Sequence, residues 1–89
     1  MRLARVTGTV TATAKHPALT GAKMLLADAV DPVTGVAANL PMVAVDTCGA
    51  GVGDTVLVAE GSAARIPPAI AGAPVDAAIV AIVDAVNTD

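Results

Sequence analysis

The stretch V-A-V-D-T-C-G-A-G-V-G-D-T-V-L-V-A-E, residues 43–60, places two apolar runs on either side of a glycine-rich segment. Both runs are rich in valine, a residue that favours β-strands, and we expect strands over residues 39–47 and 54–60. Gly49, Gly51 and Gly53 alternate between them, where glycine permits sharp turns and close backbone approach. The block therefore predicts two strands joined by a tight turn.

This glycine-rich turn lacks the features of a phosphate-binding loop. Its spacing is G-A-G-V-G and not G-x-G-x-x-G, and a strand follows it where a phosphate site needs a helix N-terminus. The Gly-Lys-Ser/Thr ending of a P-loop is also missing. We expect Gly49, Gly51 and Gly53 to serve as backbone hinges and packing points, not as ligand contacts. We expect Asp46 and Asp54 to cap the turn and to be solvated at the surface, not to act as paired catalytic carboxylates.

Outside this block, hydrophobic periodicity of two predicts further strands. Residues 4–15 alternate small apolar residues with threonines and charged residues, which indicates a half-buried strand that ends at His16–Pro17. Residues 22–31 predict another strand, in which Lys23 and Asp28 interrupt the apolar run. Residues 31–35 have turn chemistry.

The C-terminal region predicts a last strand over residues 75–86. Its β-branched residues favour strand over helix, and residues 77–83 are apolar enough to be covered on both faces. Before it, Ser62 is expected to cap one helical turn over residues 63–65, which Pro67–Pro68 ends. The whole pattern predicts an all-β fold: a small five-stranded OB-like β-barrel with one short helix, in a single domain over residues 1–89.

The composition indicates that this barrel does not stand alone. Of its 89 residues 55% are hydrophobic and the mean hydropathy is +0.74, yet Phe, Tyr and Trp are absent and alanine (21) and valine (14) dominate. A chain of this size buries only ~60–65% of its surface by itself. We therefore expect apolar surface to be buried between subunits.

Charge and residue usage exclude several classes of protein. The net charge is −3, the five basic residues are scattered, and aromatic stacking residues are lacking, so nucleic acid is not an expected partner. Residues 77–83 are far shorter than the ~20 residues of a membrane helix, and the first ten residues contain no apolar signal core. The single cysteine excludes an internal disulfide and suits a reducing cytosol.

No group of residues points to catalysis, a metal or a cofactor. His16 lies beside a proline with no second ligand near it in sequence, and we expect a surface loop residue. Cys48 has no histidine base nearby, and a small buried or half-buried side chain is expected. Ser62 is not part of a G-x-S-x-G elbow. Arg65 stands alone in an apolar stretch, which fits either a surface residue or an ion pair across an interface.

Three blocks carry a resemblance to a known family: A-R-V-T-G-T-V-T-A-T-A-K-H-P-A-L-T-G-A-K-M-L-L, then V-A-V-D-T-C-G-A-G-V-G-D-T-V-L-V-A-E-G-S-A-A-R, then V-D-A-A-I-V-A-I-V-D-A-V-N. In these the chain resembles the EutN/CcmL family, the vertex proteins of bacterial microcompartment shells. The resemblance implies a structural, non-enzymatic homopentamer without cofactors, located in a microcompartment shell in the bacterial cytoplasm. It further implies hexameric or pseudohexameric shell proteins as partners, and neither nucleic acid nor membrane.

In such a ring we expect subunit contacts at a set of turn and loop residues, in which Arg65 forms an ion pair with a carboxylate of the next subunit. The expected interface residues are Asp46, Gly49, Gly51, Gly53, Gly61, Ser62, Arg65 and Asp76, with Asp46 or Asp76 as the partner of Arg65.

One alternative from another class is a small β-barrel ligand-binding or carrier module. Lys23–Met24 is faintly similar to the modified lysine of biotin carriers, although a carrier lysine would lie at a hairpin tip and Lys23 enters an apolar strand. The mass in solution distinguishes the two, because a carrier domain would be monomeric. An enzyme is a third and weaker hypothesis, since no polar cleft is encoded.

Overall fold

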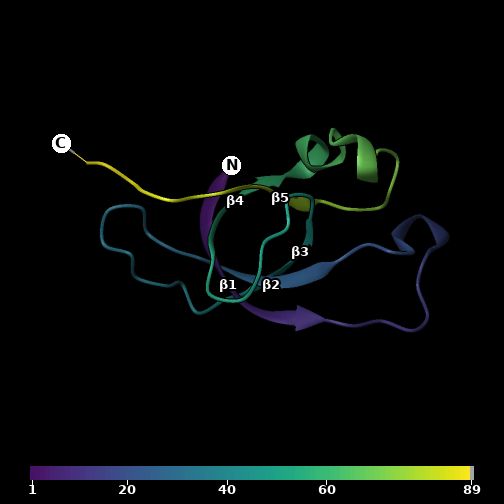
Figure 1. Ribbon diagram of the computed structural model, residues 1–89, viewed down its shortest axis with the longest axis horizontal. Coiled ribbons are helices and arrows are strands. Elements are labelled where there is room, and N and C mark those ends of the chain that lie inside the picture. Colours follow the sequence, from purple (N-terminus) through teal and green to yellow (C-terminus); the bar gives the residue numbers. More distant parts are fainter. Residues whose placement is uncertain (89) are drawn as a thin grey trace.

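A computed structural model describes residues 1–88 and shows a closed five-stranded barrel (Figure 1). The strands run in the order β1-β2-β3-β5-β4 around the barrel, and all neighbouring pairs are antiparallel except β3–β5. This confirms the predicted all-β barrel. The strand bounds are β1 Arg2–Val10, β2 Met24–Ala29, β3 Met42–Asp46, β4 Thr55–Glu60 and β5 Ala77–Ile82.

Strand β1 shows the predicted alternation but is shorter than predicted. Ala4 and Val6 are buried while Arg5, Thr7 and Thr9 are exposed. The pairing with β2 shifts by one residue between Val6 and Gly8, which is a β-bulge. The strand ends at Val10 and not at residue 15, because β2 begins at Met24, the partner of Val10, and the chain beyond Val10 has no strand to pair with.

The core consists almost entirely of small side chains. One cluster fills the barrel and contains Leu25, Val56 and Ile79 together with several alanines, including Ala50 of the glycine-rich turn. A second cluster lies between the barrel and the segment after β4, and contains Ala64 and Ile70. Alanine and valine let neighbouring backbones approach closely, so the barrel closes without aromatic residues.

The parallel pair β3–β5 is the shortest contact of the barrel. Only Val45↔Ala78 and Asp46↔Ile79 are in register, and Thr47 continues the junction with an amide and a hydroxyl that both donate to the Ile79 carbonyl, at 3.2 and 2.6 Å. Beyond Ile79, β5 pairs with β4 alone. The prediction that residues 77–83 are covered on both faces is therefore wrong for the second half, where Ile82 is 41% exposed.

The helical content also differs from the prediction. The segment Gly61–Arg65 forms a 3₁₀ helix, η2, whose N-cap is Glu60, and no side chain caps it. The expected cap by Ser62 is therefore wrong, because the helix already begins at Gly61, which adopts φ +64°. Two further 3₁₀ turns, η1 (Pro17–Leu19) and η3 (Pro68–Ile70), begin with prolines, which fix φ near the required value.

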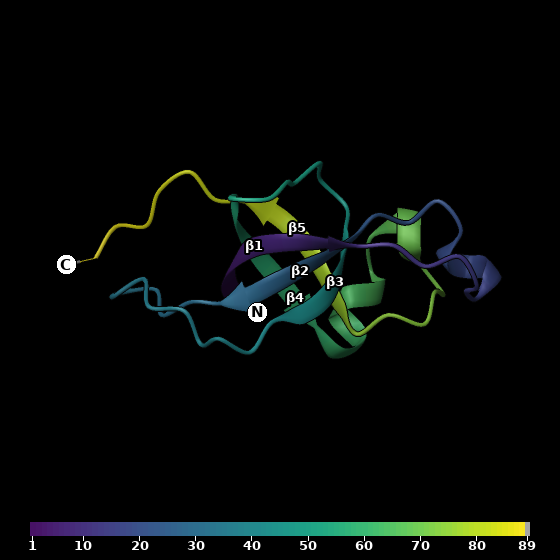
Figure 2. The ribbon, with the colours of Figure 1, turned by 90° about the horizontal axis from the view of Figure 1, so that it is seen from below.

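The molecule is elongated, with extents of 44 × 23 × 19 Å, and its loops gather at opposite ends (Figure 2). Residues 30–41 and the C-terminal segment project from one end, while residues 11–23 and 66–76 project from the other. None of the helices formed by residues 1–88 has the length and apolar character that crossing a membrane requires.

Candidate functional site

The glycine-rich turn between β3 and β4 is organised by two carboxylates. Asp46 accepts hydrogen bonds from the amides of Cys48, Gly49 and Ala50, at 3.0 to 3.2 Å, and Asp54 accepts one from the Gly51 amide at 2.8 Å. This confirms that the two aspartates cap the turn, but the expected surface solvation is wrong for Asp46, whose side chain is 4% exposed. The amides that a phosphate would need are already occupied by a carboxylate within the chain, so the turn presents negative charge and not an anion site.

Two of the three glycines are required by the backbone. Gly49 and Gly53 adopt φ of +82° and +95°, in the left-handed region that disfavours other residues, whereas Gly51 does not. A Cβ added at Gly49 or Gly53 meets nothing within 4 Å, so the expectation that these two glycines are packing points is wrong. The turn conformation alone requires them.

Lys23 fastens the start of β2 to this turn. Its ammonium donates to the Ala50 carbonyl and lies 3.7 Å from Asp46 Oδ2. The Asp46 side chain is only 4% exposed, so the ion pair compensates a nearly buried carboxylate. A lysine committed in this way, and placed before an apolar strand, does not resemble the exposed hairpin lysine of a carrier domain.

Cys48 lies on the outside of the same turn and is exposed, so the expected buried or half-buried side chain is wrong. Partial desolvation, reinforced by the negative charge of Asp46 3.7 Å from the sulfur, raises the pKa of the Cys48 thiol. The thiol is therefore held in its protonated and less nucleophilic form. This environment is the opposite of that of a catalytic cysteine.

His16 is exposed in the loop after β1, as predicted. Its Nδ1 accepts a hydrogen bond from the Ala18 amide at 3.0 Å and thereby caps η1. Within residues 1–88, no three His, Cys, Asp or Glu side chains come close enough together to bind a metal ion.

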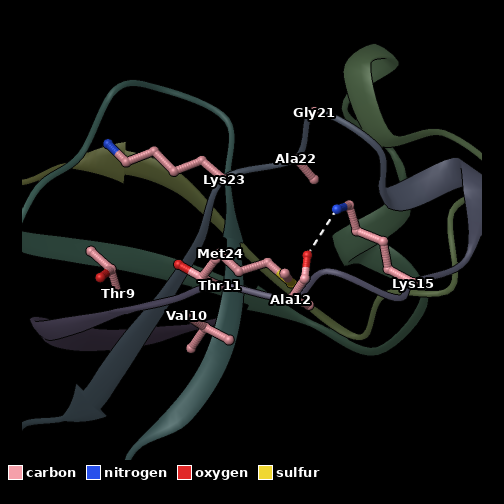
Figure 3. A pocket seen from close by; sticks show the side chains of 9 residues that line it. All are labelled: Thr9, Val10, Thr11, Ala12, Lys15, Gly21, Ala22, Lys23 and Met24. Atoms are coloured by element: carbon pink, nitrogen blue, oxygen red, sulfur yellow. Dashed lines mark hydrogen bonds between the residues drawn. The ribbon is translucent and has the colours of Figure 1, made fainter.

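A hollow of about 450 Å³ opens between the end of β1 and the start of β2 (Figure 3). It is lined by two lysines, but their ammonium groups lie far apart in Figure 3 and have different partners. Lys15 donates to the Ala12 carbonyl at 2.9 Å, and Lys23 extends toward the glycine-rich turn. The two ammonium groups do not converge, so the hollow does not form an anion site.

The expected interface residues fall into two groups in the structure. Asp46, Gly49, Gly51 and Gly53 belong to the β3–β4 turn. The other group is built around η2, where the Gly61 amide donates to the Asp76 carbonyl at 2.8 Å, and Ser62, Arg65 and Asp76 are exposed.

Sequence reasoning missed two residues that stand out in the structure by their burial or exposure. Asp28 is the one charged residue among those described that is buried as a whole residue, at 6% exposed, and it accepts hydrogen bonds from the amides of Asn39 and Leu40, both at 3.2 Å. Its interruption of an apolar run was the available signal. Ile66 is 77% exposed directly after Arg65, and its position between a charge and two prolines could have marked it.

The sequence of this chain is similar to those of known proteins. A family model described as "Ethanolamine utilisation protein EutN/carboxysome" matches residues 1–84. The chain is 45% identical over its whole length to the carboxysome shell vertex protein CcmL of Synechococcus elongatus, of which it covers 89%. It is 44% identical to the microcompartment shell vertex protein PduN of Salmonella typhimurium, over 98% of this chain and 99% of PduN.

Solved structures of shell proteins have the same fold as this chain. Gloeobacter violaceus CcmL superposes with a TM-score of 0.94 at 39% identity and covers 100% of this chain and 91% of its own. The pentameric microcompartment shell protein GrpN of Rhodospirillum rubrum superposes with a TM-score of 0.89 at 39% identity, over 100% of this chain and 99% of its own.

Proposed function

We propose, from the premise that this chain belongs to the EutN/CcmL family, that it forms the homopentamer that closes the fivefold vertices of a bacterial microcompartment shell. Like its relatives, the chain is a structural shell vertex protein and not an enzyme. The observation that carries this conclusion is the match of the whole chain to vertex proteins of two different compartments, the carboxysome protein CcmL and the microcompartment protein PduN. The shell in which it acts lies in the bacterial cytoplasm.

A ring of five identical subunits fits the properties of the single chain. GrpN, which is described as pentameric, has the same fold over essentially its entire length. A ring requires a heterologous contact, in which two different surfaces of the same chain meet. Large aliphatic side chains are exposed on loops at both ends of the barrel, among them Leu40 at 80% and Ile66 at 77%, and contact with neighbouring subunits would cover such surface.

For the subunit contact we propose the two groups of residues predicted from the sequence. The turn group is Asp46, Gly49, Gly51 and Gly53, and the η2 group is Gly61, Ser62, Arg65 and Asp76. Of the two carboxylates predicted for Arg65, Asp76 is favoured because it is exposed. Asp46 is engaged by three amides and by Lys23 within its own chain.

We further propose that the outer edge of the pentamer contacts hexameric or pseudohexameric shell proteins. Residues 1–89 then act as one vertex domain that binds no cofactor, nucleic acid or membrane. Co-expression with a hexameric shell protein tests the partner. We expect electron microscopy to show closed polyhedral shells when the vertex protein is present. Shells that close equally well in its absence would contradict the vertex role.

The oligomeric state is tested by native mass spectrometry and light scattering at micromolar concentration. We expect a particle of five times the 8.6 kDa chain mass. A protein that remains monomeric under these conditions would overturn the pentamer and would favour the carrier or ligand-binding alternative.

A further inference from the structure

Arg65 and Ile66 form an exposed pair at the end of η2. Ile66 is 77% exposed, and Arg65 has no carboxylate partner among residues 1–88. The backbone at the pair is attached to the core, because Ala64 is fully buried in the second core cluster and the Ile66 amide donates to the Ala63 carbonyl at 3.3 Å. An exposed aliphatic side chain beside an exposed cation, next to a buried residue of the same helix, has the character of an interface anchor.

An apolar hollow of about 220 Å³ lies elsewhere on the chain, between the start of β2, strand β3 and the segment that leads into β5. Its walls are aliphatic and include Met24, Val43 and Val75. Its only charged lining residue is Asp76, which is exposed and has no cation partner among the described residues. The hollow thus combines room for an aliphatic side chain with one negative charge.

The two surfaces are complementary in both charge and polarity. We propose that Ile66 of one subunit fills this hollow on the next subunit of the ring, and that Arg65 of the first forms an ion pair with Asp76 of the second. The pair is not part of the hollow's lining, so its insertion into the hollow of the next subunit joins two different surfaces, which is the heterologous contact that ring closure requires. Met24 suits the role of a wall residue, because its flexible side chain adapts to an inserted neighbour.

This inference rests on the proposed pentamer and adds to it the residues that hold the ring together. In a partly buried contact, loss of one partner of a charge pair leaves the other unpaired, and loss of a central aliphatic anchor empties the hollow. We therefore expect Ile66→Ser and Arg65→Glu each to raise the protein concentration at half-assembly by about tenfold or more.

Charge reversal provides the decisive test. Arg65→Glu and Asp76→Arg should each weaken the ring, measured by native mass spectrometry across a dilution series, whereas the double variant should recover most of the wild-type assembly. Lys15→Glu makes the same charge change on the loop after β1, and Val33→Ser removes an aliphatic side chain that is 75% exposed on another loop. Both controls should assemble as the wild type does. Circular dichroism establishes that each variant is folded.

A cross-linking experiment tests the contact without relying on weakened assembly. Pro74 is exposed and lines the hollow. In a Cys48→Ser background, chains with Ile66→Cys are mixed with chains with Pro74→Cys and oxidised mildly. Covalent dimers in the mixture, absent from either chain alone, would support the inference. A wild-type pentamer that tolerates both charge reversals, with no such dimers, overturns this inference and leaves the vertex function standing. A wild-type monomer overturns both.

Discussion

Replacing Gly53 by alanine isolates the backbone strain of the glycine-rich turn. Gly53 adopts φ +95° and its amide donates to the Val6 carbonyl at 2.9 Å, which ties the turn to β1. An added Cβ meets no atom within 4 Å, so the substitution introduces no clash. The cost is that of a left-handed conformation in an L-residue, about 1–2 kcal/mol.

Gly51→Ala is the matched control, two residues away in the same turn. Gly51 lies outside the positive-φ region, and its added Cβ would lie 4.0 Å from Asp54 Oδ2, an ordinary contact. Each glycine-to-alanine change also reduces the entropy of the unfolded chain, which stabilises by about 0.4–1 kcal/mol. Because this contribution is common to both variants, it cancels in their difference. We therefore expect Gly53→Ala to be less stable than Gly51→Ala by about 1–2 kcal/mol.

Urea denaturation followed by circular dichroism measures this difference, since the chain has no aromatic residue to report by fluorescence. All variants are compared at one protein concentration, because assembly contributes to the apparent stability. Gly49→Ala, at φ +82°, should behave as Gly53→Ala does. Equal stabilities for Gly51→Ala and Gly53→Ala would refute the strain argument. A difference in stability that varies with protein concentration would instead indicate that the substitution acts on the subunit contact.

Three further outcomes are expected. Asp28→Ala should destabilise the protein by about 2–4 kcal/mol in the same urea assay, because it leaves two amides without an acceptor, and Asp28→Asn, which keeps one acceptor oxygen, should cost less. Thr47→Val should cost about 1 kcal/mol because the hydroxyl bond to the Ile79 carbonyl is lost, whereas Thr9→Val, at an exposed position of β1, should be neutral; equal effects would contradict a special role for the Thr47 hydroxyl. Because the pKa of the Cys48 thiol is raised, its alkylation should require a higher pH in the folded protein than in urea, and coincident pH profiles would argue against this.

Much of the fold followed from local patterns in the sequence. Alternation along residues 4–10 and the valine-rich runs of β3 and β4 are properties of single strands. A strand with one buried face alternates apolar and polar residues in its own sequence, whichever strands it pairs with. The turn at residues 31–35 was predicted equally well, because Asp31 accepts the amides of Val33 and Thr34 and Gly35 adopts φ +72°. The family resemblance rested on the same local blocks, and the comparisons confirm it.

What the sequence could not determine depends on contacts between distant segments. The end of β1 at Val10 is decided by where β2 begins, and the exposure of Ile82 by the early end of β3. The three glycines of the turn looked equivalent in sequence, yet only the folded turn requires positive φ at Gly49 and Gly53 and not at Gly51. The commitment of Asp46 to its own turn, and the open position of Asp76 beside an apolar hollow, likewise arise from tertiary packing. Periodicity and turn chemistry are local and therefore readable in the sequence, whereas strand ends, burial and the availability of a charge are set by neighbours that only the closed barrel brings together.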